Sequence, residues 1–354
     1  MPPRTGHPYY MHDAIFAQPG ALRLVGRGND AALDATAAKA REAARVVLAG
    51  IGSSWHAALF GERLLAQAGG LGARVRAMSA FELAAYGPAP DAATVTIVVS
   101  HGGGSRYVRE ALDAAKRAGG TAIALTGKGH EALRAADHVL RTIEPEASST
   151  HTVSYTTALA LLVSLAIRLG AAGLAHELGE IPDHVATLLG QESWDDMAAR
   201  YAGRRRYWVL GGGPNVATAH EIALKMSEAA HVTALGFEVE QFLHGAWAAV
   251  ETDDLVVVVA PPGPTHARAL MAARVAREIG AAVLMLAEES DREAAAAASE
   301  TIAIPPTPER LSPIVAVVPL QLLTYHLALA RGVNPDTMRT HEPAYGRARG
   351  AMSL

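Results

Sequence analysis

Short apolar runs alternate with amphipathic segments along most of the chain. Runs such as "VVLAG" and "TVTIVV" are continuous in apolar residues, which is typical of parallel strands covered on both faces. Each run is followed by a glycine-containing turn and then by a segment with helical periodicity. This alternation predicts an α/β fold in which parallel sheets are flanked by helices in three layers.

The pattern occurs twice along the chain. Three segments recur in the same order at nearly constant offsets: 45–65 with 206–226, 94–126 with 255–286, and 154–170 with 316–332. The offset is far too long for a solenoid and indicates two copies of one domain. We predict an N-terminal helical segment, a first domain, a helical linker, a second domain and a tail, with the boundaries 1–35, 36–172, 173–203, 204–335 and 336–354.

Composition narrows the class of protein. The 354 residues carry a formal net charge of -4, so there is no basic field that would attract nucleic acid. The absence of cysteine excludes disulfides, thiolate metal sites and a cysteine nucleophile. The longest apolar stretch, 311–330, contains two prolines, Gln321 and His326, which favours a core helix over a membrane span. With no apolar signal segment at the start, we expect a cytoplasmic protein without a membrane partner, a cofactor or a metal.

Glycine-rich loops follow the predicted strands. "GIGSS" (50–54) and "SHGGGS" (100–105) fall at the carboxyl ends of parallel strands, where such sheets bind ligands. A dinucleotide-binding loop fits poorly, because Trp55 stands at the third glycine position of the G-x-G-x-x-G motif. An esterase also fits poorly, because the chain contains no G-x-S-x-G motif for a nucleophilic serine. Backbone N–H groups, helix N-termini and the hydroxyls of Ser53, Ser54, Ser100 and Ser105 would suit a phosphate. Each serine taken alone is more often a helix cap.

Several motifs together resemble the sugar isomerase (SIS) domain family, in particular the isomerase half of the glutamine:fructose-6-phosphate aminotransferases. The specific ones are "AHEIALKMSEAAHVTA", "FLHGAWAAV" and "SPIVAVVPLQLLTYHLALARGVNPD". "SHGGGS" occupies the place of the family's Ser-Gln-Ser-Gly-Glu-Thr loop, and "EASSTHTVSYTTAL" that of its third loop. The resemblance covers nearly the whole chain and implies two tandem SIS domains in a homodimer whose sites are shared between subunits.

The resemblance also implies roles for residues. It implies phosphosugar contacts from the three loops, at Ser53, Ser54, Ser100, His101, Gly102, Gly103, Ser105, Thr150 and His151. It makes Glu228 the carboxylate that moves a proton, supported by Glu221 and Lys225, and His244 the ring-opening acid or base of the neighbouring subunit. The i, i+4, i+7 spacing of the first three puts them on one helical face, although spacing alone more often means a solvated face with an ion pair. We also expect His101 to gain charge below neutral pH, so that phosphate affinity rises as pH falls.

Departures from the family bear on the substrate. The sequence resembles no glutaminase domain and has no cysteine nucleophile, so we expect that this chain does not use glutamine on its own. Gly102 replaces a hydroxyl, Val153 replaces a lysine, and the tail has no lysine, with Thr340 near that place. We therefore expect an enzyme that acts on an aminosugar or fructosamine phosphate by C1–C2 proton transfer, as an isomerase, a deaminase or a deglycase. The alternative is a non-catalytic phosphosugar-binding regulator or sensor.

Overall fold

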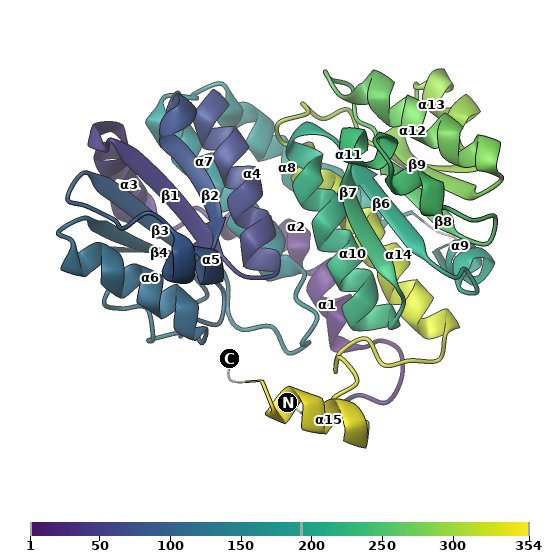
Figure 1. The fold of residues 1–354 in the computed structure, drawn as a ribbon, viewed down its shortest axis with the longest axis horizontal. Helices are drawn as coiled ribbons and strands as arrows, with labels where there is room; N and C mark the ends of the chain where they lie inside the picture. The colour runs from purple at the N-terminus through teal and green to yellow at the C-terminus, as the bar shows by residue number, and fades with distance from the viewer. Residues whose placement is uncertain (1, 192–193, 353–354) are drawn as a thin grey trace. The chain divides into compact units, whose positions relative to one another are not determined.

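Within residues 2–191 and 194–352, which the computed structural model describes, ten strands pair in parallel in two five-stranded sheets (Figure 1). The strands of the first sheet are β1 (Arg45–Gly50), β2 (Val75–Ser79), β3 (Thr94–Ser100), β4 (Thr121–Thr126) and β5 (His138–Arg141). Those of the second are β6 (Tyr207–Gly211), β7 (Ala234–Glu238), β8 (Leu255–Val259), β9 (Ala282–Glu288) and β10 (Glu300–Ile304). The orders β2-β1-β3-β4-β5 and β7-β6-β8-β9-β10 are the same topology, so the predicted α/β duplication is confirmed.

The sheets belong to two compact units. The N-terminal unit comprises the described residues of 17–146, 151–182 and 350–352, and the C-terminal unit those of 2–16, 147–150 and 183–349. The predicted linker, 173–203, contains the helices α8 (Leu174–Leu189) and α9 (Trp194–Tyr201), and its residues 192–193 lie outside the described residues. The domain boundaries given above stay predictions.

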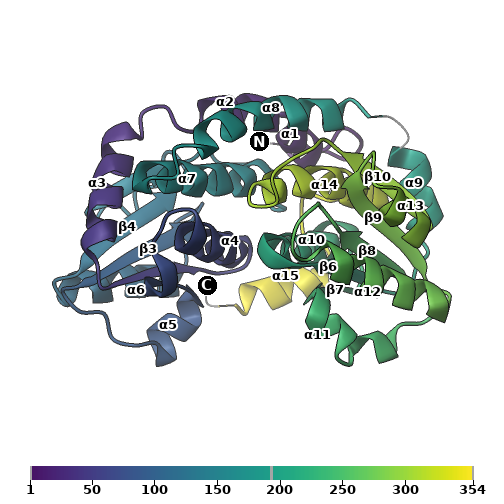
Figure 2. The same cartoon turned by 90° about the horizontal axis from the view of Figure 1, so that it is seen from above.

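Helices cover both faces of the first sheet. They are α2 (Gln18–Leu24), α3 (Asp30–Glu42), α4 (Ser53–Gln67), α5 (Ala80–Tyr86), α6 (Arg106–Arg117) and α7 (Val153–Leu169), with one short 3-10 turn, η1 (Gly72–Arg74). Leu48 of β1 faces α4, where a Cβ on Gly61 would come within 2.8 Å of the Leu48 side chain, and the next residue, Ala49, packs in the cluster of α6. This period of two buries alternate strand residues on opposite faces, so α4 and α7 lie on one side of the sheet and α5 and α6 on the other (Figure 2).

The C-terminal unit repeats the three layers. Besides α9, its helices are α1 (Tyr10–Phe16), α10 (Val216–Ala230), α11 (Val239–Leu243), α12 (His266–Ile279), α13 (Arg292–Ala297), α14 (Ser312–Ala330) and α15 (Pro343–Gly350), with η2 (Gly213–Asn215) and η3 (Ala246–Ala249). Helices α10 and α14 pack on each other, and α12 packs on β8 and β9 in a cluster built on Trp208, Val258 and Met285. The N-terminal α1 joins this unit because the carboxylate of Asp336 accepts hydrogen bonds from the backbone N–H groups of Tyr10 (2.9 Å) and Met11 (2.8 Å).

Helix α14 is the longest apolar segment. By length and composition it could cross a membrane, but 16 of its 19 residues are buried inside the C-terminal unit. Gln321 and Thr324 are among the buried residues, and the Thr324 hydroxyl donates to the Leu320 carbonyl at 2.7 Å. The prediction of a core helix for this stretch is therefore confirmed.

Candidate functional site

The loops that follow β1 and β3 lie at the same edge of the first sheet, because parallel strands end together. Helix α4 begins directly at this edge, since Gly52 adopts a φ of +59° and turns the chain into Ser53. A Cβ on Gly50 would lie 2.4 Å from the backbone of Ser54, so only glycine allows the first turn of α4 to pack this closely on the strand end. The "GIGSS" motif thus fixes both serines at the carboxyl edge of the sheet.

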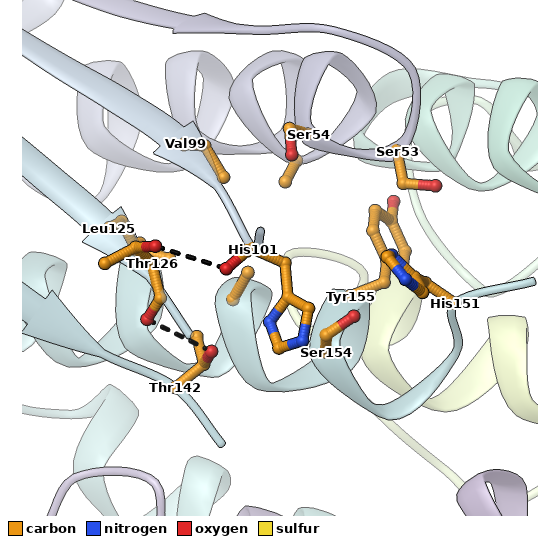
Figure 3. A pocket seen from close by; sticks show the side chains of 12 residues that line it. Ser53, Ser54, Val99, His101, Leu125, Thr126, Thr142, His151, Ser154 and Tyr155 are labelled. Carbon is orange, nitrogen blue, oxygen red and sulfur yellow. Dashed lines mark hydrogen bonds between the residues drawn. The ribbon is translucent and has the colours of Figure 1, made fainter. Parts of the chain in front are cut away.

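A small cavity opens where this edge meets the N-terminal ends of α4 and α7. It encloses about 30 Å³, and its lining residues are Ser53, Ser54, Ala57, Val99, His101, Leu125, Thr126, Thr142, His151, Ser154, Tyr155 and Ala158. Figure 3 shows the His101 ring projecting toward Ser154, with Ser53 and Ser54 on the opposite side. Hydroxyls from two helix N-termini and an imidazole therefore converge on one space.

His101 is held in this cavity by its backbone. Its carbonyl accepts hydrogen bonds from Thr126 Oγ1 (3.2 Å) and from the N–H of Gly127 (3.0 Å). The ring packs on Gly127, where an added Cβ would lie 2.8 Å from two ring atoms. Gly127 therefore makes room for the imidazole below the loop.

Burial leaves the His101 imidazole without partners. Both ring nitrogens are buried and have no hydrogen-bond partner among the described residues. Burial lowers the pKa of His101 to about 4; the nearby His151 and His130 act in the same direction, and Glu146 opposes them. Burial therefore moves the pH at which His101 gains charge well below neutral, and its effect on phosphate binding stays a prediction.

Glu146 positions the start of α7. Its carboxylate accepts hydrogen bonds from the N–H groups of Thr152 (2.9 Å) and Ser154 (2.9 Å) and from Thr152 Oγ1 (3.2 Å). This satisfies N–H groups that a helix end leaves without partners. Glu146 is not among the predicted site residues, and neither are Thr126, Thr142, Ser154 and Tyr155; the position of Glu146 in "EASSTHT" was a signal that could have identified it.

The predicted phosphosugar-binding residues divide into three groups. Ser53, Ser54, His101 and His151 line the cavity. Ser100, Gly102, Gly103 and Ser105 belong to the adjoining loop, in which Gly103 has a φ of +63° and added Cβ atoms on Gly102 and Gly104 would meet open space. Thr150 is buried in the C-terminal unit, where its hydroxyl donates to the Pro335 carbonyl at 2.7 Å.

The predicted carboxylates and lysine lie together on α10 in the C-terminal unit. Lys225 Nζ lies 3.6 Å from Glu221 Oε1 and 2.5 Å from Glu228 Oε2. The side chain of Glu221 is 0% exposed, that of Lys225 2% and that of Glu228 19%. The three residues share one face as expected, but a solvated face is wrong, because the side chains of Glu221 and Lys225 are buried.

His244 contacts a different carboxylate, that of Glu240. It follows α11, its side chain is 73% exposed, and its Nδ1 lies 2.8 Å from the Glu240 carbonyl. The Glu240 carboxylate is bound by Arg268, and this hydrogen bond lowers the pKa of Glu240. An exposed imidazole oriented by its own helix is accessible to a ligand or to another subunit.

Comparison with known proteins identifies the family to which this architecture corresponds. The SIS domain profile matches residues 39–168 and 201–331. The glutamine–fructose-6-phosphate aminotransferase (isomerizing) of Thermococcus kodakarensis is 32% identical over 353 residues, which cover 96% of this chain and 58% of that protein. The corresponding protein of Pyrococcus horikoshii is 31% identical over 350 residues, with the same coverage of 96% and 58%. The chain therefore spans 58% of the length of these curated relatives.

Solved structures share the fold. The C-terminal domain of glucosamine-fructose-6-phosphate aminotransferase from Francisella tularensis superposes with a TM-score of 0.84 at 18% identity, covering 94% of this chain and 99% of that one. Tagatose-6-phosphate ketose/aldose isomerase from Escherichia coli gives 0.80 at 21%, covering 96% and 97%. Glucosamine-6-phosphate deaminase from Thermotoga maritima gives 0.70 at 20%, covering 92% and 96%.

Proposed function

Because this chain belongs to the SIS domain family, with two SIS domains in tandem, we propose that it is an enzyme acting on a phosphorylated aminosugar or a fructosamine phosphate. The reaction is a proton transfer between C1 and C2 of the open-chain sugar. Isomerisation, deamination and release of an amino acid all pass through this transfer. The relatives and folds named above are those of sugar-phosphate isomerases, aminotransferases and a deaminase, which supports this class of reaction.

One observation carries the binding half of the proposal, and it is the unpartnered imidazole of His101. A buried polar group without a hydrogen bond costs about 1–3 kcal/mol, so such groups are retained where a ligand satisfies them. The N-termini of α4 and α7 and the hydroxyls of Ser54 and Ser154 surround the same space. Helix N-termini and neutral donors suit a phosphate group.

The glycine loop next to the cavity refines where the phosphate binds. Added Cβ atoms on Gly102 and Gly104 would meet open space, so the backbone of this loop is accessible to an anion. We place the phosphate between this loop and the hydroxyls of Ser54 and Ser154, within reach of the His101 ring.

The catalytic half of the proposal rests on α10. A C1–C2 proton transfer needs a base within hydrogen-bond reach of the substrate. Two carboxylates contact Lys225 Nζ. The carboxylate of Glu228 is partly exposed, whereas that of Glu221 is fully buried. We assign Glu228 as the base, Lys225 as the group that holds it, and Glu221 as the second counter-charge of the lysine. His244, exposed after α11, opens the sugar ring from the neighbouring subunit of a homodimer.

Paired calorimetric titrations test the binding half. Fructose 6-phosphate should bind and fructose should bind at least about tenfold more weakly, because the loop recognises the phosphate. Ser154→Ala removes a lining hydroxyl and should weaken binding of the phosphate form only. Ser164→Ala is the matched control, since Ser164 lies ten residues further along α7 and bonds to the Ala160 carbonyl. Equal affinity of wild type for both sugars would contradict phosphate recognition, and binding without turnover would point to a sensor.

A further inference from the structure

The C-terminal unit contains a second copy of the two glycine loops, and we call the loops around Gly213 and Gly263 to Thr265 the second cradle. Gly213 follows β6 with a φ of +55°, as Gly52 follows β1 with a φ of +59°. Gly263 and Thr265 follow β8 at the places that Gly103 and Ser105 take after β3, at an offset of 160 residues. Thr265 packs directly on the first loop, because a Cβ on Gly212 would lie 2.5 Å from Thr265 Cβ. The duplicated domain has therefore kept the loop geometry that suits an anion.

A carboxylate of the chain itself lies in this second cradle. Thr265 Oγ1 donates to Glu309 Oε1 at 3.1 Å. A Cβ on Gly263 would lie 2.5 Å from Glu309 Cδ and 2.8 Å from each carboxylate oxygen, and one on Gly213 would lie 3.3 Å from Oε1. Both glycine loops and the residue before α12 thus contact one carboxylate. Glu309 is placed by its backbone, whose carbonyl accepts a hydrogen bond from Ser312 Oγ (2.8 Å) at the start of α14.

The N-terminal unit differs at the corresponding place. The acidic residue that precedes α7, Glu146, binds the N–H groups of Thr152 and Ser154, and the glycine loop keeps open space around Gly102 and Gly104. One copy of the cradle is therefore open, and the other holds a built-in anion.

We propose that Glu309 closes the second cradle against phosphate, so that each chain binds one phosphate group, and that removing this carboxylate creates a second phosphate site. A phosphate placed on Gly213, Gly263 and Thr265 would coincide with the Glu309 carboxylate and be repelled by its charge. The ligand of the opened site is a phosphate or a sugar phosphate, which the Thr265 hydroxyl and the N-terminus of α12 would hold. The count of one in wild type rests on the function proposed above; the gain of a site on removing Glu309 does not.

Equilibrium dialysis with inorganic phosphate and with fructose 6-phosphate tests this. We expect one site per chain in wild type and two in both Glu309→Ala and Glu309→Gln, with the second lost again when Thr265→Val is added. Glu289→Gln changes an exposed glutamate of the same unit and should keep the wild-type count. Circular dichroism melting of each variant shows that the fold is kept.

The outcomes separate the two proposals. No site in wild type and one in the Glu309 variants would overturn the proposed function and support the closed cradle. An unchanged count in both Glu309 variants, or two sites in wild type, would overturn the closed cradle. A gained site that survives Thr265→Val would also overturn it, since the new site would then lie elsewhere.

Discussion

The ammonium nitrogen of Lys225 lies 2.5 Å from the carboxylate of Glu228, one turn further along α10, and Lys225 is almost completely buried. Glu221 contacts the same nitrogen from the preceding turn and is fully buried. A buried ion pair is strongly coupled to the rest of the fold, because each charge depends on its partner for solvation. The arrangement makes Lys225 the residue that fixes the geometry and charge of Glu228.

Replacing Lys225 by methionine should therefore destabilise the C-terminal unit. Glu221 and Glu228 would lose the counter-charge of the lysine, and removing one partner of a buried ion pair typically costs about 3–5 kcal/mol. Urea unfolding followed by the fluorescence of the buried Trp208 measures the loss. Adding Glu221→Gln should recover part of it, and the exposed Lys116→Met should change the free energy of unfolding by less than about 0.5 kcal/mol. A Lys225→Met protein as stable as wild type would show that the ion pair is not needed for folding.

The pKa of His101 predicts how stability depends on pH. Its folded-state pKa, about 4, lies below the ordinary value of 6.5, so between these values the unfolded chain binds the proton and the folded protein does not. The contribution of neutral His101 to the free energy of unfolding is complete above pH 6.5. It is lost as pH falls toward 4, with a slope of up to about 1.4 kcal/mol per pH unit. His101→Gln should remove this part of the slope, whereas the exposed His176→Gln should not. Parallel stability curves for wild type and His101→Gln would refute the assigned burial.

The exposure of His244 allows a test of the proposed shared site. His244→Ala and Glu228→Gln proteins should each be inactive, and mixing them should restore part of the activity through hybrid dimers. The physical reason is that a hybrid contains one site with both intact residues. Differently tagged subunits show whether exchange has occurred. If tagged hybrids form and activity stays absent, His244 does not complete the partner's site.

Much of this could be predicted from the sequence because it depends on local patterns. The repeat of apolar runs and Gly-x-Gly turns predicted two parallel sheets, and the i, i+4, i+7 spacing placed Glu221, Lys225 and Glu228 on one face. The burial of Glu221 and Lys225 depends on contacts with other elements of the fold, which the spacing within α10 does not contain.

The rest of the candidate site depends on contacts between distant residues. The burial of the His101 imidazole follows from its packing on Gly127, which is 26 residues further along the chain. Glu309 contacts loops 46 and 96 residues earlier, at Gly263 and Gly213, so no local motif marks it. Ser154 was missed because the residue that positions it, Glu146, binds through backbone N–H groups, which carry no sequence signature.

Solvent deuterium exchange tests the central claim, proton transfer by Glu228 on a phosphosugar, most directly. Fructose 6-phosphate and glucosamine 6-phosphate are incubated with the protein in D₂O, and loss of the C1 and C2 proton signals is followed by NMR. Wild type should exchange at least one of the phosphosugars and not fructose. Glu228→Gln should lower the rate roughly 10²–10⁴-fold while ligand affinity is kept, and Ser227→Ala, its exposed neighbour on α10, should exchange at the wild-type rate. Exchange by Glu228→Gln at the wild-type rate, or no exchange of either phosphosugar by wild type, would contradict the account.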